Sequence, residues 1–447
     1  MVKKNGAKGF KRLHTVLNDL FGVNRPVSAC VIVSAIAIAV AAFWFFYSAP
    51  PTTIVITSGP KGSIFEMNAE KYAKILAKNG VKLKILPSDG SVENLNRLAD
   101  PKFRVDAGFV QGGLANGVNT DNLVSLGSVS YAPLLVFYKA SGSFDMLSEL
   151  EGRRISIGQP GSGTRALALN LLAANGIYPG GETTLLDLDS RDAVKALING
   201  DADAVFIMGE SAPLKTIRQL FLTPDIRLLD FSQAEAYARK LQYLNKLDLP
   251  KGAVDFGMDI PDHNISLVAP MVELVVRKNL HPALQDLLIE AAQEVHGKAN
   301  ILQRAGQFPA PIQHEFRIST EAMRFYKSGK TFLYRSLPFR LASISTRILA
   351  VVVPLVVLLF PGMKIIPAVY QWRIKMRIYH WYRELLTLEK DMLAQPSPQE
   401  RQKLMARLEH IGKEVNRMKL PASFGDQFYV LLEHVDFVRE RLKEGAR

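Results

Sequence analysis

The chain has 447 residues, which is enough for two or more independently packed regions. Its hydrophobic content of 48% is ordinary for a globular protein, while its net charge of +13 invites comparison with nucleic-acid-binding proteins. The charge is concentrated near the ends, with six Lys/Arg against one Asp in residues 1–26 and 15 Lys/Arg against 11 acidic residues in 371–447. Because this excess flanks apolar segments, the sequence predicts a lipid bilayer as a partner and no nucleic acid.

A first apolar segment follows the basic N-terminus, residues 1–26, which we expect in the cytoplasm. Val27–Tyr47 is uncharged over 21 residues, about 31 Å as a helix, and this is enough to cross a bilayer. A cleaved signal peptide is the alternative, but the segment is long and lacks small residues at the cleavage positions. Cys30 is the only cysteine, so no intrachain disulfide can form, and it precedes the apolar run that a lipoprotein cleavage site would follow. We predict a retained transmembrane helix at 27–47.

From Thr52 onward, short apolar runs alternate with helical stretches. The first series has predicted strands at Thr53–Thr57, Val81–Leu86, Val105–Val110 and Leu123–Val129, and predicted helices at Phe65–Lys78 and Val92–Ala99. After a strand-like run at Ala132–Tyr138, the second has strands at Arg154–Ile157, Thr184–Leu188 and Ala204–Met208, and helices at Thr164–Ala174, Asp192–Asn199 and Ala212–Phe221. Ile226–Leu229 and Val272–Val276 are expected to return the chain to the first unit. The pattern predicts a two-lobed α/β domain over 52–332, with largely parallel sheets and the second lobe at about 140–225.

The stretch Gly158–Gly176 joins a predicted strand to a predicted helix through a glycine-rich turn. The first turn of a helix leaves backbone N–H groups unpaired, so an anion can dock there. A tight connection with no ligand remains an alternative. A nucleotide-binding loop shares the glycine spacing, but Thr164-Arg165 stands where that loop needs Lys followed by Ser or Thr.

Several motifs in this region resemble those of the TAXI-type solute receptors of TRAP transporters, which have a type II periplasmic-binding-protein fold. The motifs are Ile56–Gly59, Pro87–Leu95, Asp106–Gln111, Gly158–Thr164 and Asp201–Phe206. The resemblance implies a solute between the two lobes and a membrane permease as partner. The first loop, Gly59–Phe65, departs from the Gly/Thr-rich form usual in that family.

The predicted ligand-binding residues follow strand ends, which form the crevice of open α/β sheets. They are Lys61, Gly62, Ser63, Phe65, Ser91, Asn94 and Gln111 on the first lobe, and Ser162, Gly163, Thr164 and Arg165 on the second. Helix starts at Ser63, Ser91 and Ser162 are expected to converge on one anionic group of a small carboxylate solute. Ser91–Asn94 fits a helix capping box equally well, so Ser91 is either a cap or a ligand contact.

The sequence offers no catalytic constellation and implies no cofactor. It shows neither a nucleophile-elbow spacing nor a paired-cysteine motif. His281 and His296 are fifteen residues apart, without the spacing of a metal site. We therefore expect neither catalysis nor a bound metal.

A second apolar run, Ile348–Met363, reaches spanning length at 346–370 if Lys364 extends to the interface. Pro354 within it is tolerable in a membrane helix, and a buried core helix is the alternative. The basic border Trp372–Arg377 returns the chain to the cytoplasm, so 371–447 forms a helical tail. Two apolar stripes in the tail predict a helical hairpin or a docking surface: Leu404, Leu408, Ile411, Val415 and Met418, and Phe428, Leu431, Leu432, Val435 and Val438.

These features together predict a two-pass protein of the bacterial inner membrane, with both termini cytoplasmic and a periplasmic solute-binding domain. The expected function is capture of a small anionic solute for a TRAP-type permease. A sensor that relays solute binding to the cytoplasmic helices is a second hypothesis, and an enzyme acting on a phosphorylated substrate is a third.

Overall fold

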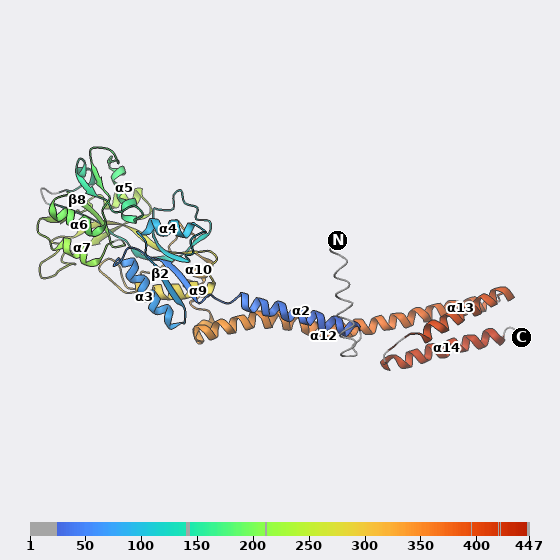
Figure 1. Ribbon diagram of the computed structural model, residues 1–447. Coiled ribbons are helices and arrows are strands. Elements are labelled where there is room, and N and C mark those ends of the chain that lie inside the picture. The colour runs from blue at the N-terminus through green and yellow to red at the C-terminus, as the bar shows by residue number, and fades with distance from the viewer. Residues whose placement is uncertain are drawn as a thin grey trace. The chain divides into compact units, whose positions relative to one another are not determined.

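The computed structural model describes residues 25–139, 144–210, 212–394, 396–418, 420 and 422–444 (Figure 1). The chain divides into two compact units, Ser48–Arg347 and Met1–Tyr47 with Ile348–Arg447. The first contains the α/β region and the second is helical in its described part. The basic residues ahead of Arg25 that were expected in the cytoplasm lie outside the described residues.

One sheet of the α/β unit has the strand order β10-β11-β3-β1-β2, with β4 also paired to β11. Its strands are β1 (Thr53–Thr57), β2 (Lys82–Leu86), β3 (Ala107–Gln111), β4 (Leu123–Tyr131), β10 (Leu244–Leu249) and β11 (Ile265–Arg277). β1 pairs in parallel with β2 and β3, whereas β11 is antiparallel to β3, β4 and β10. We call this sheet and its helices the first lobe.

A second sheet has the order β7-β6-β8-β5-β9. Its strands are β5 (Leu134–Lys139), β6 (Arg154–Ser156), β7 (Thr184–Leu186), β8 (Ala204–Met208) and β9 (Ile226–Leu228). β6 is parallel to β7 and β8, and β5 is antiparallel to β8 and β9. This sheet and its helices form the second lobe, whose strands extend over 134–228 where the sequence suggested about 140–225.

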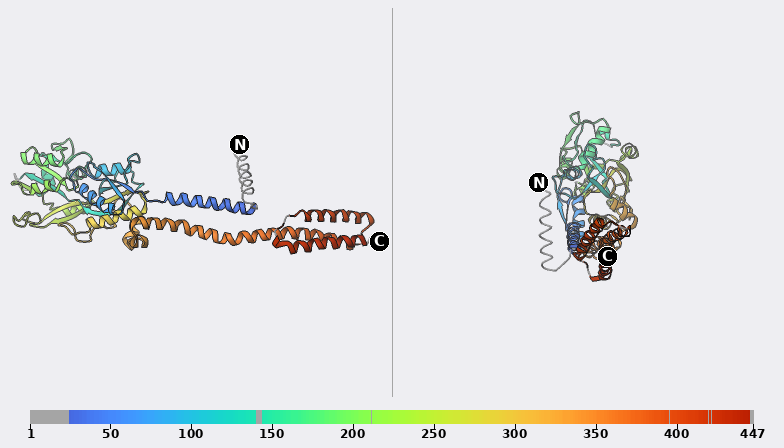
Figure 2. Two further views of the ribbon diagram at one scale, coloured as in Figure 1. Left: turned by 60° about the horizontal axis from the view of Figure 1, so that its bottom comes forward. Right: turned by 90° about the vertical axis from the view of Figure 1, so that its right-hand side faces the viewer.

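Helices cover both sheets (Figures 1 and 2). The first lobe carries α3 (Ile64–Lys78), α4 (Ser91–Ala99), α9 (Pro282–His296) and α10 (Thr320–Ser328); the second carries α5 (Gly163–Ala174), α6 (Ser190–Asn199) and α7 (Leu214–Phe221). Short helices α8 (Ala234–Lys240) and α11 (Phe332–Ser336) lie between later elements. The central strands β3 and β8 are buried at every position. This explains why both read as unbroken apolar runs, because a covered parallel strand has no solvent face.

The apolar stripe of α3 shows how burial stabilises the packing of a helix on the first sheet. α3 buries Phe65, Ala69, Tyr72 and Leu76, which recur at helical spacing along one side. Burial of a large apolar side chain contributes roughly 1.5–3 kcal/mol. Phe109 of β3 packs against Phe65 and Tyr72 at ring-centroid distances of 5.2 and 5.6 Å. The apolar stripe of α3 thereby fixes the helix, and the loop before it, over the sheet.

Some sequence-based expectations are wrong. The sheets are mixed instead of largely parallel, because the long strand β11 runs antiparallel to its neighbours in the first lobe. Ile226–Leu228 pairs with β5 and stays in the second lobe instead of returning to the first. Val272–Val276 does return to the first sheet, as part of β11.

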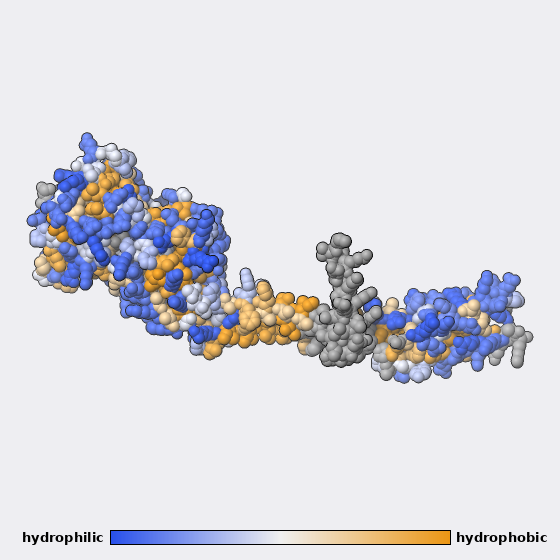
Figure 3. All heavy atoms as spheres, in the orientation of Figure 1, coloured by the Kyte–Doolittle hydropathy of each residue, from blue (hydrophilic) through white to orange (hydrophobic). Residues whose placement is uncertain are grey.

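Two helices bear on the membrane prediction. α2 (Arg25–Tyr47) encloses the predicted span at 27–47, and its side chains are described from Ala35 onward. α12 (Phe339–Leu393) is a continuous helix of 55 residues. Among the described side chains, only the α12 window Phe339–Val357 is long and apolar enough to cross a bilayer, with a mean hydropathy of 1.8. It begins before the predicted start at 346, and Figure 3 shows apolar surface along this stretch.

The end of α12 packs with two further helices, α13 (Pro398–Asn416) and α14 (Gly425–Glu444). Ser397 and Glu400 form a reciprocal capping box at the start of α13. Both predicted stripes lie in the resulting core, together with Ile378, Leu385 and Leu388 of α12. The predicted hairpin is confirmed, with α12 as a third member that the sequence analysis did not assign.

Candidate functional site

The predicted site centres on three helix starts, at α3, α4 and α5. Ser63 is the N-cap of α3 and accepts a hydrogen bond from the Glu66 N–H at 3.3 Å. Ser162 is the N-cap of α5 and accepts from the Arg165 N–H at 3.2 Å. α4 differs, because its N-cap is Gly90 and no side chain caps it. The capping-box alternative for Ser91 is therefore wrong, and the Ser91 hydroxyl is directed elsewhere.

The Ser91 hydroxyl donates a hydrogen bond to Glu210, which follows β8 and belongs to the second lobe. Oε1 of Glu210 accepts from the Thr164 N–H at 3.1 Å, and the backbone N–H groups of Gly163 and Ser91 also stabilise its charged form. Ser91 is fully buried, and Glu210 is 2% exposed. The starts of α4 and α5 therefore do converge on one carboxyl group, as predicted for a solute, but the group is the protein's own Glu210.

Gln111 completes this buried cluster. Its Nε2 donates to the Gly163 carbonyl at 2.9 Å, which links the first lobe to the second. Its Oε1 has no hydrogen-bond partner among the described atoms. A Cβ on Gly163 would stand 2.6 Å from Glu210 Oε1 and closer still to Gln111 Oε1. Only glycine fits at position 163 without displacing one of these oxygens.

Burial dominates the ionisation of Glu210. It raises the pKa of the carboxyl group to about 7, against 4.5 ordinarily, although the Ser91 hydroxyl and the Thr164, Gly163 and Ser91 N–H groups all favour the charged form. Near neutral pH the group is divided between acid and carboxylate. The acid form can donate a proton toward an acceptor such as Gln111 Oε1.

Direct backbone contacts also join the lobes around this cluster. The Glu93 N–H donates to the Gly161 carbonyl and the Ile64 N–H donates to the Gly209 carbonyl, both at 3.1 Å. Together with the Gln111 bond, they close the crevice in which the sequence analysis expected a solute.

Asn94 is a structural residue in the described chain. Its Nδ2 donates to the carbonyls of Ser58 and Phe109 at 2.6 and 2.9 Å, and its Oδ1 accepts from the hydroxyls of Thr57 and Ser88 at 2.6 and 2.7 Å. These bonds use its full hydrogen-bonding capacity and tie together the ends of β1 and β3. The predicted role of Asn94 as a ligand contact is wrong for this conformation.

Other predicted residues also have local roles. The Gly62 N–H donates to Glu66 Oε2 at 2.5 Å in a left-handed turn, with φ of 81°. Phe65 is a core residue against Phe109. Arg165 forms an ion pair with Asp187.

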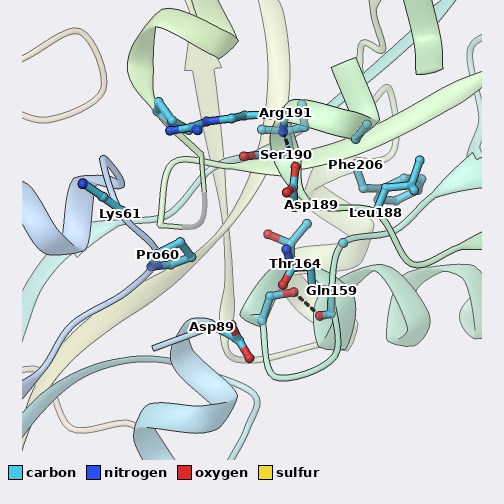
Figure 4. A pocket seen from close by; sticks show the side chains of 15 residues that line it. Pro60, Lys61, Asp89, Gln159, Thr164, Leu188, Asp189, Ser190, Arg191 and Phe206 are labelled. Atoms are coloured by element: carbon cyan, nitrogen blue, oxygen red, sulfur yellow. Dashed lines mark hydrogen bonds between the residues drawn. The ribbon is translucent and has the colours of Figure 1, made fainter. Parts of the chain in front are cut away.

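A polar pocket of about 250 Å³ lies beside the buried cluster and between the lobes. Of the predicted residues it contains Lys61, Ser162 and Thr164; the sequence analysis missed Asp89, Asp189, Ser190 and Arg191, which also line it. Figure 4 shows Lys61 and Arg191 along one edge and Asp89 on the opposite side. The signal that could have found Arg191 is its place at the start of α6, directly after a strand, like the other helix starts.

Two cationic side chains, Lys61 and Arg191, and two carboxylates, Asp89 and Asp189, line this pocket. Asp189 caps α6, accepting from the N–H groups of Arg191 and Asp192 at 2.8 Å each. Partial burial, and then the neighbouring Glu93, raise the pKa of Asp89 from its ordinary value. Within the described residues, neither Lys61 nor Arg191 forms a salt bridge. The pocket therefore offers two side-chain cations to a solute.

A second, mostly apolar cavity of about 480 Å³ lies on the other side of Glu210. Phe65, Leu135, Ile217, Phe221 and Leu302 contribute to its wall, and Glu210 and His296 are among its polar lining residues. Burial lowers the pKa of His296 to about 3, so its ring is neutral. Because Glu210 lines this cavity and its partner Thr164 lines the polar pocket, their hydrogen bond lies between the two spaces.

The described residues contain no group of three His, Cys, Asp or Glu side chains that could hold a metal ion.

Comparison with solved structures gives similarities to periplasmic solute-binding proteins. The aliphatic sulphonate binding protein SsuA from Escherichia coli is 17% identical, with 55% of this chain and 73% of that chain covered and a TM-score of 0.36. An ancestral arginine-binding protein bound to arginine is 15% identical, with 55% and 92% covered and a TM-score of 0.36. The substrate binding protein of an amino acid ABC transporter is 17% identical, with 54% and 92% covered and a TM-score of 0.33.

A comparison with family models matches a range that includes all of the second lobe and most of the first. Residues 62–294, more than half of the chain, match the model of the NMT1-like family. The match includes Ser91, Gln111, Gly163 and Glu210, the residues at which the lobes meet. The chain belongs to the NMT1-like family.

Proposed function

We propose that this protein is a membrane-anchored solute-binding receptor for a small anionic solute, such as a carboxylate, and that it catalyses no reaction. The observation that carries the proposal is the polar pocket between the lobes, in which Lys61 and Arg191 have no salt-bridge partner among the described side chains. Ser162 and Ser190 also line this pocket. A pocket with a few convergent polar groups and two cations that are not held in salt bridges suits a small anion.

The membrane part of the proposal rests on α2 and α12. Large apolar side chains of α12, including Leu349, Val353 and Val357, are exposed in the described unit. Exposed apolar groups in such number are unfavourable in water and favourable in a bilayer. Pro354 would cost about 3 kcal/mol inside a water-exposed helix but is tolerated in membrane helices. We place the solute-binding domain in the periplasm of a bacterium, with both termini in the cytoplasm.

The expected partner for transport is a TRAP-type permease in the same membrane. A sensor is a second candidate, and the continuity of α12 favours it. α12 is a single helix whose first residues, from Phe339, belong to the α/β unit and whose later residues contribute to the three-helix core of the tail. A continuous helix can transmit a conformational change, which a sensor needs. A transport receptor needs only to be anchored in the membrane. Purification from the native membrane separates the two: a stoichiometric permease supports transport, and a cytoplasmic signalling protein bound to the tail supports sensing.

Solute binding is tested on the full chain in lipid nanodiscs. Thermal stability is measured with dicarboxylates, amino acids, sulfonates and phosphate, because a ligand that binds only the folded state raises its melting temperature. A hit is then titrated against the double variant Lys61→Ala/Arg191→Ala, which should weaken binding at least about tenfold if both cations contact the anion.

Lys84→Ala/Arg227→Ala is the matched control, because it removes the same charge from exposed positions on β2 and β9. Equal affinity of the pocket variant and the native chain would refute the proposed site. A panel with no hit, or with only cationic hits, would refute the proposed solute class.

A further inference from the structure

The carboxyl group of Glu210 occupies the place where a bound anion would satisfy both lobes at once. We propose that the junction of the two lobes is a carboxyl-binding site that the chain fills with its own Glu210, so that the lobes close with no solute bound. A free carboxylate binds there only when the Glu210 side chain is removed. This inference goes beyond the proposed function, because it concerns the buried junction and not the polar pocket.

The donors of this site come from both lobes. The first lobe supplies the Ser91 hydroxyl and the Ser91 N–H at the start of α4, and the second supplies the N–H groups of Gly163 and Thr164 at the start of α5. Glu210 itself reaches them from the end of β8. Hydrogen bonds to a charged carboxylate are about twice as strong as those between neutral groups. One carboxyl group thus connects two helix starts that belong to different lobes.

Gln111 is a second, independent sign that the site is built for a carboxyl group. The Gln111 side chain is 1% exposed, and its Nε2 donates to the Gly163 carbonyl. This bond fixes the orientation of the amide group, and Oε1 is left without a hydrogen-bond partner among the described atoms. Oε1 and Glu210 Oε1 both crowd the point where a Gly163 Cβ would stand. Gln111 Oε1 is buried and accepts no hydrogen bond among the described atoms, so a carboxyl group that holds its proton is a donor that could satisfy it. Burial, which raises the pKa of Glu210 to about 7, agrees with this arrangement.

The site has no room for a second carboxyl group. Ser91, Gln111 and Glu210 are all nearly inaccessible, and the absence of a Gly163 side chain is already needed for the oxygens present. A solute therefore cannot reach these donors while Glu210 holds them. Closure of the lobes becomes a property of the chain instead of a response to solute.

Chemical rescue tests the proposal on the full chain in nanodiscs. Glu210→Ala should lower the melting temperature, and acetate should restore it by about 3 °C at about ten times its Kd. Acetate should not stabilise a chain that keeps Glu210, at the same ionic strength, when both chains carry Lys61→Ala/Arg191→Ala to remove the cations of the polar pocket. Acetamide, which has the same shape but offers one acceptor oxygen instead of two, should rescue Glu210→Ala less than acetate does at the same concentration. The additional substitution Ser91→Ala should weaken rescue by acetate at least about tenfold.

Lobe closure is measured separately by the distance between spin labels at Lys102 and Asp201, exposed positions on the first and second lobes, in a Cys30→Ser background. The native chain should show a single short distance without solute, and Glu210→Ala a longer or broader distribution that acetate narrows. Glu210→Gln, which keeps the shape and hydrogen-bonding groups, controls for folding and should stay closed.

Two results would overturn the proposal: a Glu210→Ala protein that remains closed without acetate, or one that folds and gains nothing from acetate. These results do not depend on Lys61 and Arg191. The absence of any solute hit in the polar pocket would refute the proposed function and leave this inference intact.

Discussion

The hydroxyl of Ser91 and the carboxyl group of Glu210 are hydrogen-bonded across the two lobes, although 119 residues separate them in the chain. The bond joins the start of α4 to the end of β8. It lies where the sequence predicted a solute, so removal of the hydroxyl tests the lobe junction directly.

Ser91→Ala should destabilise the α/β domain by about 1–3 kcal/mol, because it removes one donor from a buried carboxyl group. Urea unfolding followed by intrinsic fluorescence measures the change. Ser128→Ala is the control: that hydroxyl is also fully buried but has no hydrogen-bond partner among the described atoms, so its loss should be neutral or stabilising. Equal losses in the two variants would argue against an energetic role for the Ser91–Glu210 bond.

Glu273 predicts a pH dependence of stability. It is 1% exposed on β11, and burial, followed by repulsion from Glu315, raises its pKa from 4.5 to about 7. Between these two values the folded chain keeps a proton that the unfolded chain has lost. This group's contribution to the free energy of unfolding therefore falls as the pH rises through that window and levels off above it.

Glu273→Gln cannot ionise and should remove this loss. The variant should match the native chain near pH 4 and exceed its stability by about 3 kcal/mol near pH 8, as measured by urea unfolding across the range. Glu151→Gln, at an exposed position, should show a difference that does not change with pH. If the difference in unfolding free energy between Glu273→Gln and the native chain did not change with pH, the raised pKa of Glu273 would be contradicted.

Asn94→Ala should be among the most destabilising single changes in the first lobe. It leaves two hydroxyls and two carbonyls without their partner, and each buried unsatisfied group costs about 1–3 kcal/mol. We expect a loss above about 3 kcal/mol in urea unfolding. Asn119→Ala, which removes an amide from an exposed loop, should cost less than about 1 kcal/mol. A small loss at Asn94 would restore it as a candidate ligand contact.

Arg165→Ala separates the site predicted from sequence from the one found in the structure. Arg165 is paired with Asp187 and does not line the polar pocket. Its removal should therefore change solute affinity less than about twofold, while Arg191→Ala weakens binding strongly. Calorimetric titration of both variants with the same anion gives the comparison. A larger effect at Arg165 than at Arg191 would reverse the assignment.

The elements that the sequence predicted well are those whose apolar residues, by their number or their spacing, show which positions are buried. β8 is apolar throughout, β3 is apolar up to Gln111, and α3 repeats its apolar residues at helical spacing. β10 was missed because its burial alternates irregularly along Leu244–Leu249 and polar residues interrupt it. The sequence pattern could not predict that β11 runs antiparallel to β3, because a buried strand is an apolar run in both parallel and antiparallel pairs.

At the site, the sequence identified the helix starts but not what they bind. Ser91 and Gly163 were found because strand ends and small residues have a local signature. Glu210 was missed because nothing near it in the sequence shows that its side chain turns toward donors more than 40 residues away. Buried partnerships of this kind are decided by tertiary packing, and a glutamate after a strand is otherwise an ordinary surface residue.

α12 is one helix from Phe339 to Leu393, so residues inserted within it extend an unbroken helical run. Each alanine inserted below the apolar window would turn everything downstream by about 100°, and seven insertions would nearly restore the original facing. If the tail reads torsion of this helix, its output should oscillate with the length of the insertion. If the tail only needs to be attached to the rest of the chain, its output should be the same for every length of insertion.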